Sequence, residues 1–157
     1  LHLYSSVIIL NEYYRAVEWD YGLEEVSSYI KDFYQEVPVI FDNSRDEMYI
    51  QVAFFLKYDP KLFQEQNFEV ELKDYYNQMD RVKEKKIGKI ITRPIDWDQD
   101  LKTEQYLVGD ELAISHEQIK EHQLFLKKEI YYPDGSVAFR IVKTNPQFEL
   151  KQTDPDK

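Results

Sequence analysis

The sequence contains no cysteine, only four glycines and only three histidines among 157 residues. The absence of cysteine excludes disulfides, thiolate metal sites and a cysteine nucleophile. The histidines, His2, His116 and His122, are scattered, and no spacing of His with Asp or Glu resembles a metal site. We therefore expect neither a metal nor a cofactor, and no residue receives a catalytic assignment.

Acidic residues outnumber basic ones, since 20 Lys and Arg stand against 30 Asp and Glu, for a net charge of −10. Nucleic-acid binders gain much of their affinity by neutralising phosphates, so no nucleic-acid partner is expected. The apolar stretch from Leu3 to Leu10 is too short to cross a bilayer, and no signal peptide is evident. Because residue 1 is not a methionine, we expect a piece of a longer protein, with any membrane segment upstream.

Residues 19–60 predict a helix, a short strand and a second helix in unbroken succession. Asp20 is a good N-cap, and apolar residues then recur at spacings of three and four until Pro38 ends the helix. The apolar run 39–41, closed by polar residues, is typical of a strand covered on both faces. This order indicates an α/β layered domain.

The spacing of Ser44 and Glu47 forms a capping box, which predicts the start of the second helix. Eight of the nine residues 48–56 are apolar, so this helix is expected to be buried nearly all round. A short helix should follow from Pro60 to about Gln66, because Asp59 and Pro60 suit an N-cap and a first turn.

Further strands are expected at 87–92 and 105–109, and a hairpin at 125–142 with its turn at 133–136. The predicted fold is three-layer α/β/α, with a mainly parallel sheet and a C-terminal antiparallel β-hairpin. We expect one α/β domain over 19–144, after a juxtamembrane or N-terminal segment at 1–18. A polar tail at 145–157 is expected to be disordered.

Polar side chains gather where the predicted strands end, which is where open α/β sheets bind ligands. The cluster after the first strand comprises Asp42, Asn43, Asp46 and Glu47, and Asp110 and Glu111 follow the third strand. The first turn lacks glycine and carries three carboxylates, which disfavours a phosphate ligand. The carboxylates could hold a divalent cation or form a glycosidase pair, but capping and solvation explain them without a ligand.

Aromatic residues make up 15% of the chain, including 13 tyrosines. This content suits a surface that meets carbohydrate, a partner or a membrane interface, although tyrosines lining the edge of the core would explain it too. Trp97 beside Asp96, and Trp19, are candidate contacts for a carbohydrate or a partner, because an indole can stack on a sugar while a carboxylate binds its hydroxyls. Packing of each indole at the edge of the domain is the alternative.

Four segments resemble, in order, the C-terminal soluble domain of prokaryotic membrane glycosyltransferases of the dolichyl-phosphate-mannose-protein mannosyltransferase type. They are Trp19-Asp20-Tyr21-Gly22, the second helix from Tyr49-Ile50 to Leu56-Lys57-Tyr58-Asp59-Pro60, Pro94-Ile95-Asp96-Trp97, and Tyr131-Tyr132-Pro133-Asp134-Gly135-Ser136. The set covers most of residues 13–142, while 67–86 and 110–124 match nothing in the family.

The resemblance implies a parent with many transmembrane helices, which transfers a sugar from a polyprenyl-phosphate carrier outside the cytoplasm. Its catalytic carboxylate lies in an early loop that this chain lacks, so no catalytic residue is carried over. The chain would be a non-catalytic accessory domain on the extracytoplasmic face of the cell membrane. Its partners would be the upstream transmembrane portion and a glycan or protein acceptor. The alternatives are a free-standing carbohydrate- or protein-binding α/β module and, third, a small hydrolase.

Overall fold

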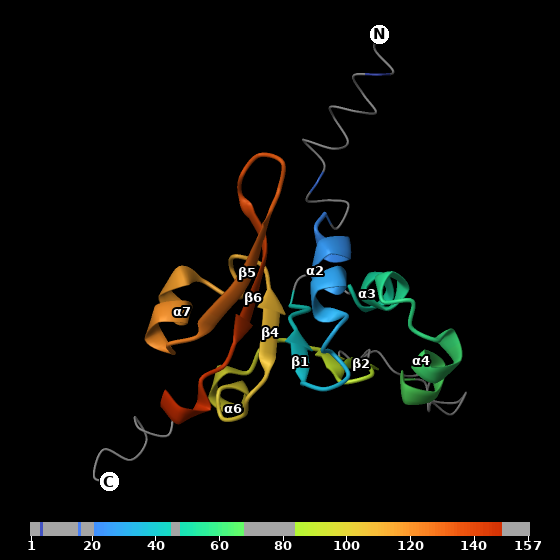
Figure 1. Ribbon diagram of the computed structural model, residues 1–157, viewed down its shortest axis with the longest axis horizontal. Helices are drawn as coiled ribbons and strands as arrows, with labels where there is room; N and C mark the ends of the chain where they lie inside the picture. Colours follow the sequence, from blue (N-terminus) through green and yellow to red (C-terminus); the bar gives the residue numbers. More distant parts are fainter. Residues whose placement is uncertain (1–3, 5–15, 17–20, 45–47, 68–83, 149–157) are drawn as a thin grey trace, which may run out of the picture.

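The computed structural model describes residues 4, 16, 21–44, 48–67 and 84–148, and these residues form helices around one open sheet (Figure 1). The predicted α/β fold is confirmed. In chain order the elements are α2 (Leu23–Ile30), β1 (Val39–Phe41), α3 (Tyr49–Phe55), α4 (Pro60–Asn67), β2 (Lys85–Ile87), β3 (Ile90–Thr92), α6 (Trp97–Asp100), β4 (Tyr106–Gly109), α7 (His116–Glu121), β5 (Phe125–Tyr131) and β6 (Val137–Lys143).

The six strands lie in the order β2-β3-β1-β4-β6-β5. β1 pairs in parallel with β3 on one side and with β4 on the other. The remaining pairs, β2 with β3, β4 with β6 and β5 with β6, are antiparallel. The sheet is therefore mixed, and the prediction of a mainly parallel sheet is correct only for its three central strands.

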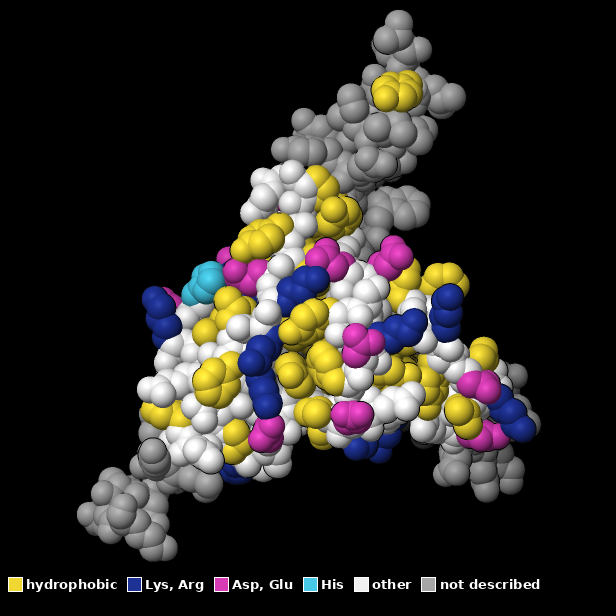
Figure 2. Space-filling model, in the orientation of Figure 1, with side chains coloured by type: hydrophobic (Ala, Val, Ile, Leu, Met, Phe, Trp, Pro, Cys, Tyr) yellow, Lys and Arg dark blue, Asp and Glu magenta, His cyan; other side chains and the backbone are white. Residues whose placement is uncertain are grey.

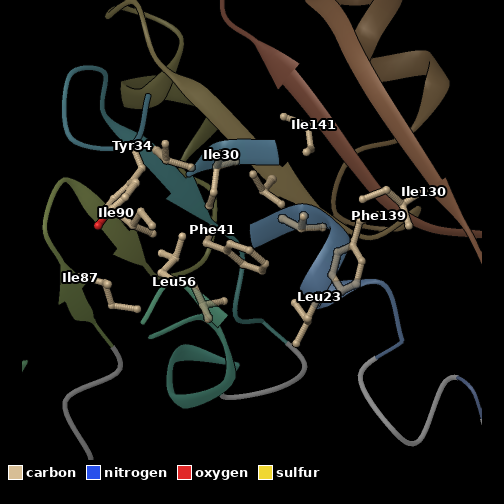
Figure 3. Close-up of a cluster of buried hydrophobic side chains, with 14 of the residues drawn as sticks. Leu23, Ile30, Tyr34, Phe41, Leu56, Ile87, Ile90, Ile130, Phe139 and Ile141 are labelled. Carbon is tan, nitrogen blue, oxygen red and sulfur yellow. The ribbon is translucent and has the colours of Figure 1, made fainter. Parts of the chain in front are cut away.

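The core lies on both faces of the sheet because successive residues of a strand point to opposite sides. In β1, Val39 and Phe41 join a cluster with α2, while Ile40 joins a second cluster with Ile114 and Leu124 around α7. All three residues of β1 are buried, as the sequence predicts for a strand covered on both faces. Figure 3 shows the first cluster, where α2 and α3 meet the central strands.

The two predicted helices of residues 19–60 differ in extent from the expectation. α2 ends at Ile30, well before Pro38, and the chain continues through turns in which the Phe33 amide donates to the Ile30 carbonyl. α3 begins at Tyr49 with Met48 as its N-cap, and neither cap nor first turn uses Ser44. The capping-box prediction for this helix start is therefore wrong.

The prediction that the second helix is buried nearly all round is also wrong. Within α3 only Val52 is buried, whereas the side chains of Ile50 and Phe54 are 61% and 75% exposed. One side of α3 packs against α2 and β2, and the opposite side, which carries Ile50 and Phe54, is left exposed by the described chain. Packing in the core therefore explains only some of the apolar residues of α3.

The expected strand at 87–92 is in fact two antiparallel strands, β2 and β3, joined by a tight turn at Gly88. Gly88 has a φ of +62°, a conformation that L side chains rarely adopt. The outer edge of β2 is capped by Asn67 at the end of α4, whose side chain accepts from the Lys86 amide and donates to the Lys86 carbonyl. α4 itself matches the predicted helix after Asp59.

Candidate functional site

The carboxyl ends of β1, β3 and β4 meet at one edge of the sheet, because these three strands are parallel. Asp42, Arg93 and Asp110 are the first residues after the three strands. This edge is the place at which the sequence predicts a ligand. The contacts of each polar side chain decide whether a ligand could use it.

Both carboxylate oxygens of Asp42 accept hydrogen bonds from within the chain. The residue is 7% exposed, and its Oδ1 accepts from the Ser44 hydroxyl at 2.7 Å and from the Ile95 amide at 3.2 Å. Its Oδ2 accepts from the Ser44 amide at 3.1 Å. Asp42 thus ties the end of β1 to the segment that follows β3, 53 residues further along the chain.

The rest of the predicted cluster is only partly described. The side-chain amide of Asn43 donates to the carbonyl of Thr92, the last residue of β3, at 3.4 Å. Asp46, Glu47 and Trp19 lie outside the described residues. The structure therefore places Asp42 and Asn43 together at the sheet edge, as bridges from β1 to the neighbouring strand and its loop.

Asp96 and Trp97 lie at the start of α6. Asp96 is the N-cap, and its side chain accepts from the Gln99 amide. Trp97 is half-buried, packs against the cluster around Ile40 and stacks on His122, with ring centroids 5.4 Å apart and planes 11° apart. These contacts give both residues a structural role. A carbohydrate contact at this pair stays a prediction.

A partly buried ion pair between Arg93 and Asp100 anchors α6. The guanidinium of Arg93 donates to both carboxylate oxygens of Asp100, with the Nη1 contact at 2.8 Å. The Asp96 amide and the Gln105 side chain donate to the same carboxylate. Burial alone would raise the pKa of Asp100, but these hydrogen bonds, led by Arg93, outweigh it and lower the pKa.

A fully buried cation, Arg140, lies in β6, the strand next to β4, near the same ends of the parallel strands. The residue is 1% exposed and stands opposite Gly109 of β4 and Glu129 of β5. Its Nε donates to Glu129 at 2.8 Å, and one terminal nitrogen donates to the Ile114 carbonyl at 2.7 Å. Hydrogen bonds from Arg140 and Tyr131 lower the pKa of Glu129.

Sequence reasoning did not single out Arg140. The sequence does show one sign of its role, because Arg140 is the only charged residue in the apolar run 137–142. A charged side chain in a strand that is covered on both faces needs a buried partner. Which partner it finds depends on the β5–β6 register and on the 110–115 loop, neither of which a local pattern gives. Glu111 completes the surroundings of this arginine at 3.5 Å.

Asp110, predicted at the end of the third strand, accepts from the amides of Leu112 and Ala113 at 3.0 and 2.7 Å. Together with Asp42 and Asp100 it shows one pattern, in which each buried or half-buried carboxylate of the edge binds backbone amides or arginine. General acid–base catalysis needs a carboxyl that can reach a substrate proton. Within the described chain, these groups instead stabilise loops.

Among the described residues no group of three or more His, Asp or Glu side chains is placed to hold a metal ion. None of the described helices has both the length and the apolar character needed to cross a bilayer. Comparison of the chain with family models, with curated proteins and with solved structures gives no match.

Replacing Arg140 tests whether the buried charge pair holds the sheet edge. Arg140→Ala should lower the free energy of unfolding by about 3–5 kcal/mol, because it leaves the Glu129 carboxylate and the Ile114 carbonyl without their partner. The double variant Arg140→Met with Glu129→Leu should recover most of that loss, since it removes both charges. Urea denaturation gives the free energies of unfolding of the parent protein, the single variant and the double variant. A loss below about 1 kcal/mol for Arg140→Ala would contradict the structural role of this charge pair.

The lowered pKa of Asp100 predicts a pH-dependent contribution to stability. A carboxyl whose pKa is lower when folded than when unfolded stabilises the fold above its unfolded pKa and loses this effect as the pH falls through the folded pKa. Asp100→Asn should therefore cost about 1.5–3 kcal/mol at pH 7. That difference from the parent protein should shrink below about pH 4.

Chemical denaturation at several pH values between 7 and 2.5 gives this profile. Asp98→Asn is the matched control, because Asp98 lies exposed in the same short helix and should change stability little at any pH. A cost for Asp100→Asn that is the same at pH 7 and at pH 2.5 would show that the carboxylate charge is not what stabilises α6.

Proposed function

We propose that this chain is a non-catalytic accessory domain, on the extracytoplasmic face of the cell membrane, of a glycosyltransferase that takes a sugar from a polyprenyl-phosphate donor. It would shape the access of the acceptor, bind a partner or stabilise the membrane part of the enzyme. The observation that most supports this proposal lies at the carboxyl ends of the parallel strands. There Asp42, Asp100 and Asp110 each accept hydrogen bonds from backbone amides or arginine. Catalysis would then belong to another part of the enzyme.

The resemblance of the four ordered segments supplies the glycosyltransferase part of the proposal. Two of these segments have structural roles that fit an accessory domain. Pro94 to Trp97 forms the loop that Asp42 and Asp100 hold, and residues 131–136 connect the antiparallel strands β5 and β6. Helices against both faces of β1 support a three-layer α/β/α arrangement, with the β5–β6 pair as its C-terminal hairpin.

The partners under this proposal are the transmembrane portion of the same polypeptide and a glycan or protein acceptor. The second candidate is a free-standing carbohydrate- or protein-binding module. Such a module would account for the exposed apolar side chains of α3, Ile50 and Phe54, which are uncovered in the described chain. An isolated module and an accessory domain would share such a surface, so the surroundings of the chain must distinguish them.

The coding sequence upstream of Leu1 separates the two candidates. The accessory-domain proposal predicts several apolar segments of about 20 residues in the same reading frame. It further predicts that membranes carrying the longer protein transfer sugar from a polyprenyl-phosphate donor, and that deleting residues 21–148 reduces this transfer without abolishing it. A start codon or a signal peptide directly before Leu1 would refute the proposal and favour the free-standing module.

A further inference from the structure

Three aromatic rings form a continuous row on the face of the sheet that α2 covers only in part. Tyr29 of α2 contacts Phe33 edge-on, with centroids 5.8 Å apart, and Phe33 meets Tyr106 of β4 at 4.4 Å. All three residues are half-buried. Figure 2 shows hydrophobic side chains gathered between α2 and the β5–β6 pair, with charged side chains beside them. We call Tyr29, Phe33 and Tyr106 the aromatic row.

The charges that flank the aromatic row cancel. Lys128 of β5 pairs with Glu25 of α2 at 2.8 Å, and its ammonium lies 5.4 Å from the Tyr29 ring centroid. At the other end, Lys143 of β6 pairs with Glu104. Each of these two ammonium groups is therefore already balanced by a carboxylate. A charged ligand would have to break one pair to gain a partner.

The aromatic row also offers groups for hydrogen bonding. Within the described part of the chain, the phenol hydroxyls of Tyr29 and Tyr106 bond to no other residue. Their oxygens can donate and accept, and the ion-paired carboxylates and ammonium groups beside them add further donors and acceptors. Phe33 and Tyr106 pack against each other and Lys128 lies over Tyr29, so each ring is open to a ligand only on its remaining exposed part. Exposed ring surface next to hydrogen-bonding groups suits a ligand with both apolar C–H faces and many hydroxyls.

We infer that an uncharged oligosaccharide binds along the aromatic row. The inference deepens the proposed function, because it names the ligand class and the site through which the domain would contact a glycan acceptor. It differs from the contact predicted at Trp97, whose ring stacks on His122 and packs in the cluster of the opposite face. A protein partner would find more exposed apolar surface on α3, at Ile50 and Phe54.

The test is a titration of the isotopically labelled full chain with mannotetraose and with cellotetraose, followed by NMR. At least one of them should shift the amide signals of residues 25–33 and 104–107 in a saturable manner. Tyr106→Ala should weaken binding about tenfold or more, the equivalent of about 1.4 kcal/mol. Tyr29→Phe keeps the ring and the fold and removes only the hydroxyl, so it should weaken binding by a smaller factor.

One variant serves as a control for general aromatic effects. Phe54→Ala removes a more exposed ring from α3 and should leave the dissociation constant unchanged. The inference is overturned if neither oligosaccharide binds, if the shifted signals centre on α3 or on α6 and α7, or if only the charged tetragalacturonate binds. Failure here together with apolar segments upstream of Leu1 would leave the accessory-domain proposal intact.

Discussion

The burial of β1 on both faces is the constraint on which the rest of the structure depends. Three consecutive apolar residues, 39–41, stand at the centre of the sheet, and each has to be covered. α2 and α3 cover one face, and the chain around Ile114 and Leu124 covers the other. Because β3 and β4 both pair with β1 in parallel, they come from distant segments of the chain. Side chains then hold the ends of these strands in place.

Carboxylates hold the carboxyl ends of the parallel strands in place. Asp42 joins β1 to the loop after β3, Asp100 binds Arg93 and the Asp96 amide, and Asp110 closes the turn after β4. Buried carboxylates are costly unless paired or hydrogen-bonded, and each of these three has found such partners inside the chain. The edge that an open α/β sheet commonly offers to a ligand is here occupied by its own loops.

The sequence correctly predicts those elements that depend on residues close together in the chain. The strand at 39–41 and the helix after Asp59 follow from apolar spacing and capping, and both are present. The split of 87–92 into β2 and β3 depends on a positive φ at Gly88, and the exposure of Phe54 depends on what packs over α3. The partners of Arg140 come from two other segments, so no short-range pattern could assign them.

The central claim is that the carboxylates after the strands are structural, and Asp42→Ala tests it most directly. Residues that serve a ligand are often held at a cost to stability, so removing one leaves a protein as stable or more stable. Asp42 should behave in the opposite way: urea unfolding should show a loss of about 2–4 kcal/mol, because the Ser44 and Ile95 donors lose a buried acceptor. Unchanged or increased stability in Asp42→Ala would contradict the account.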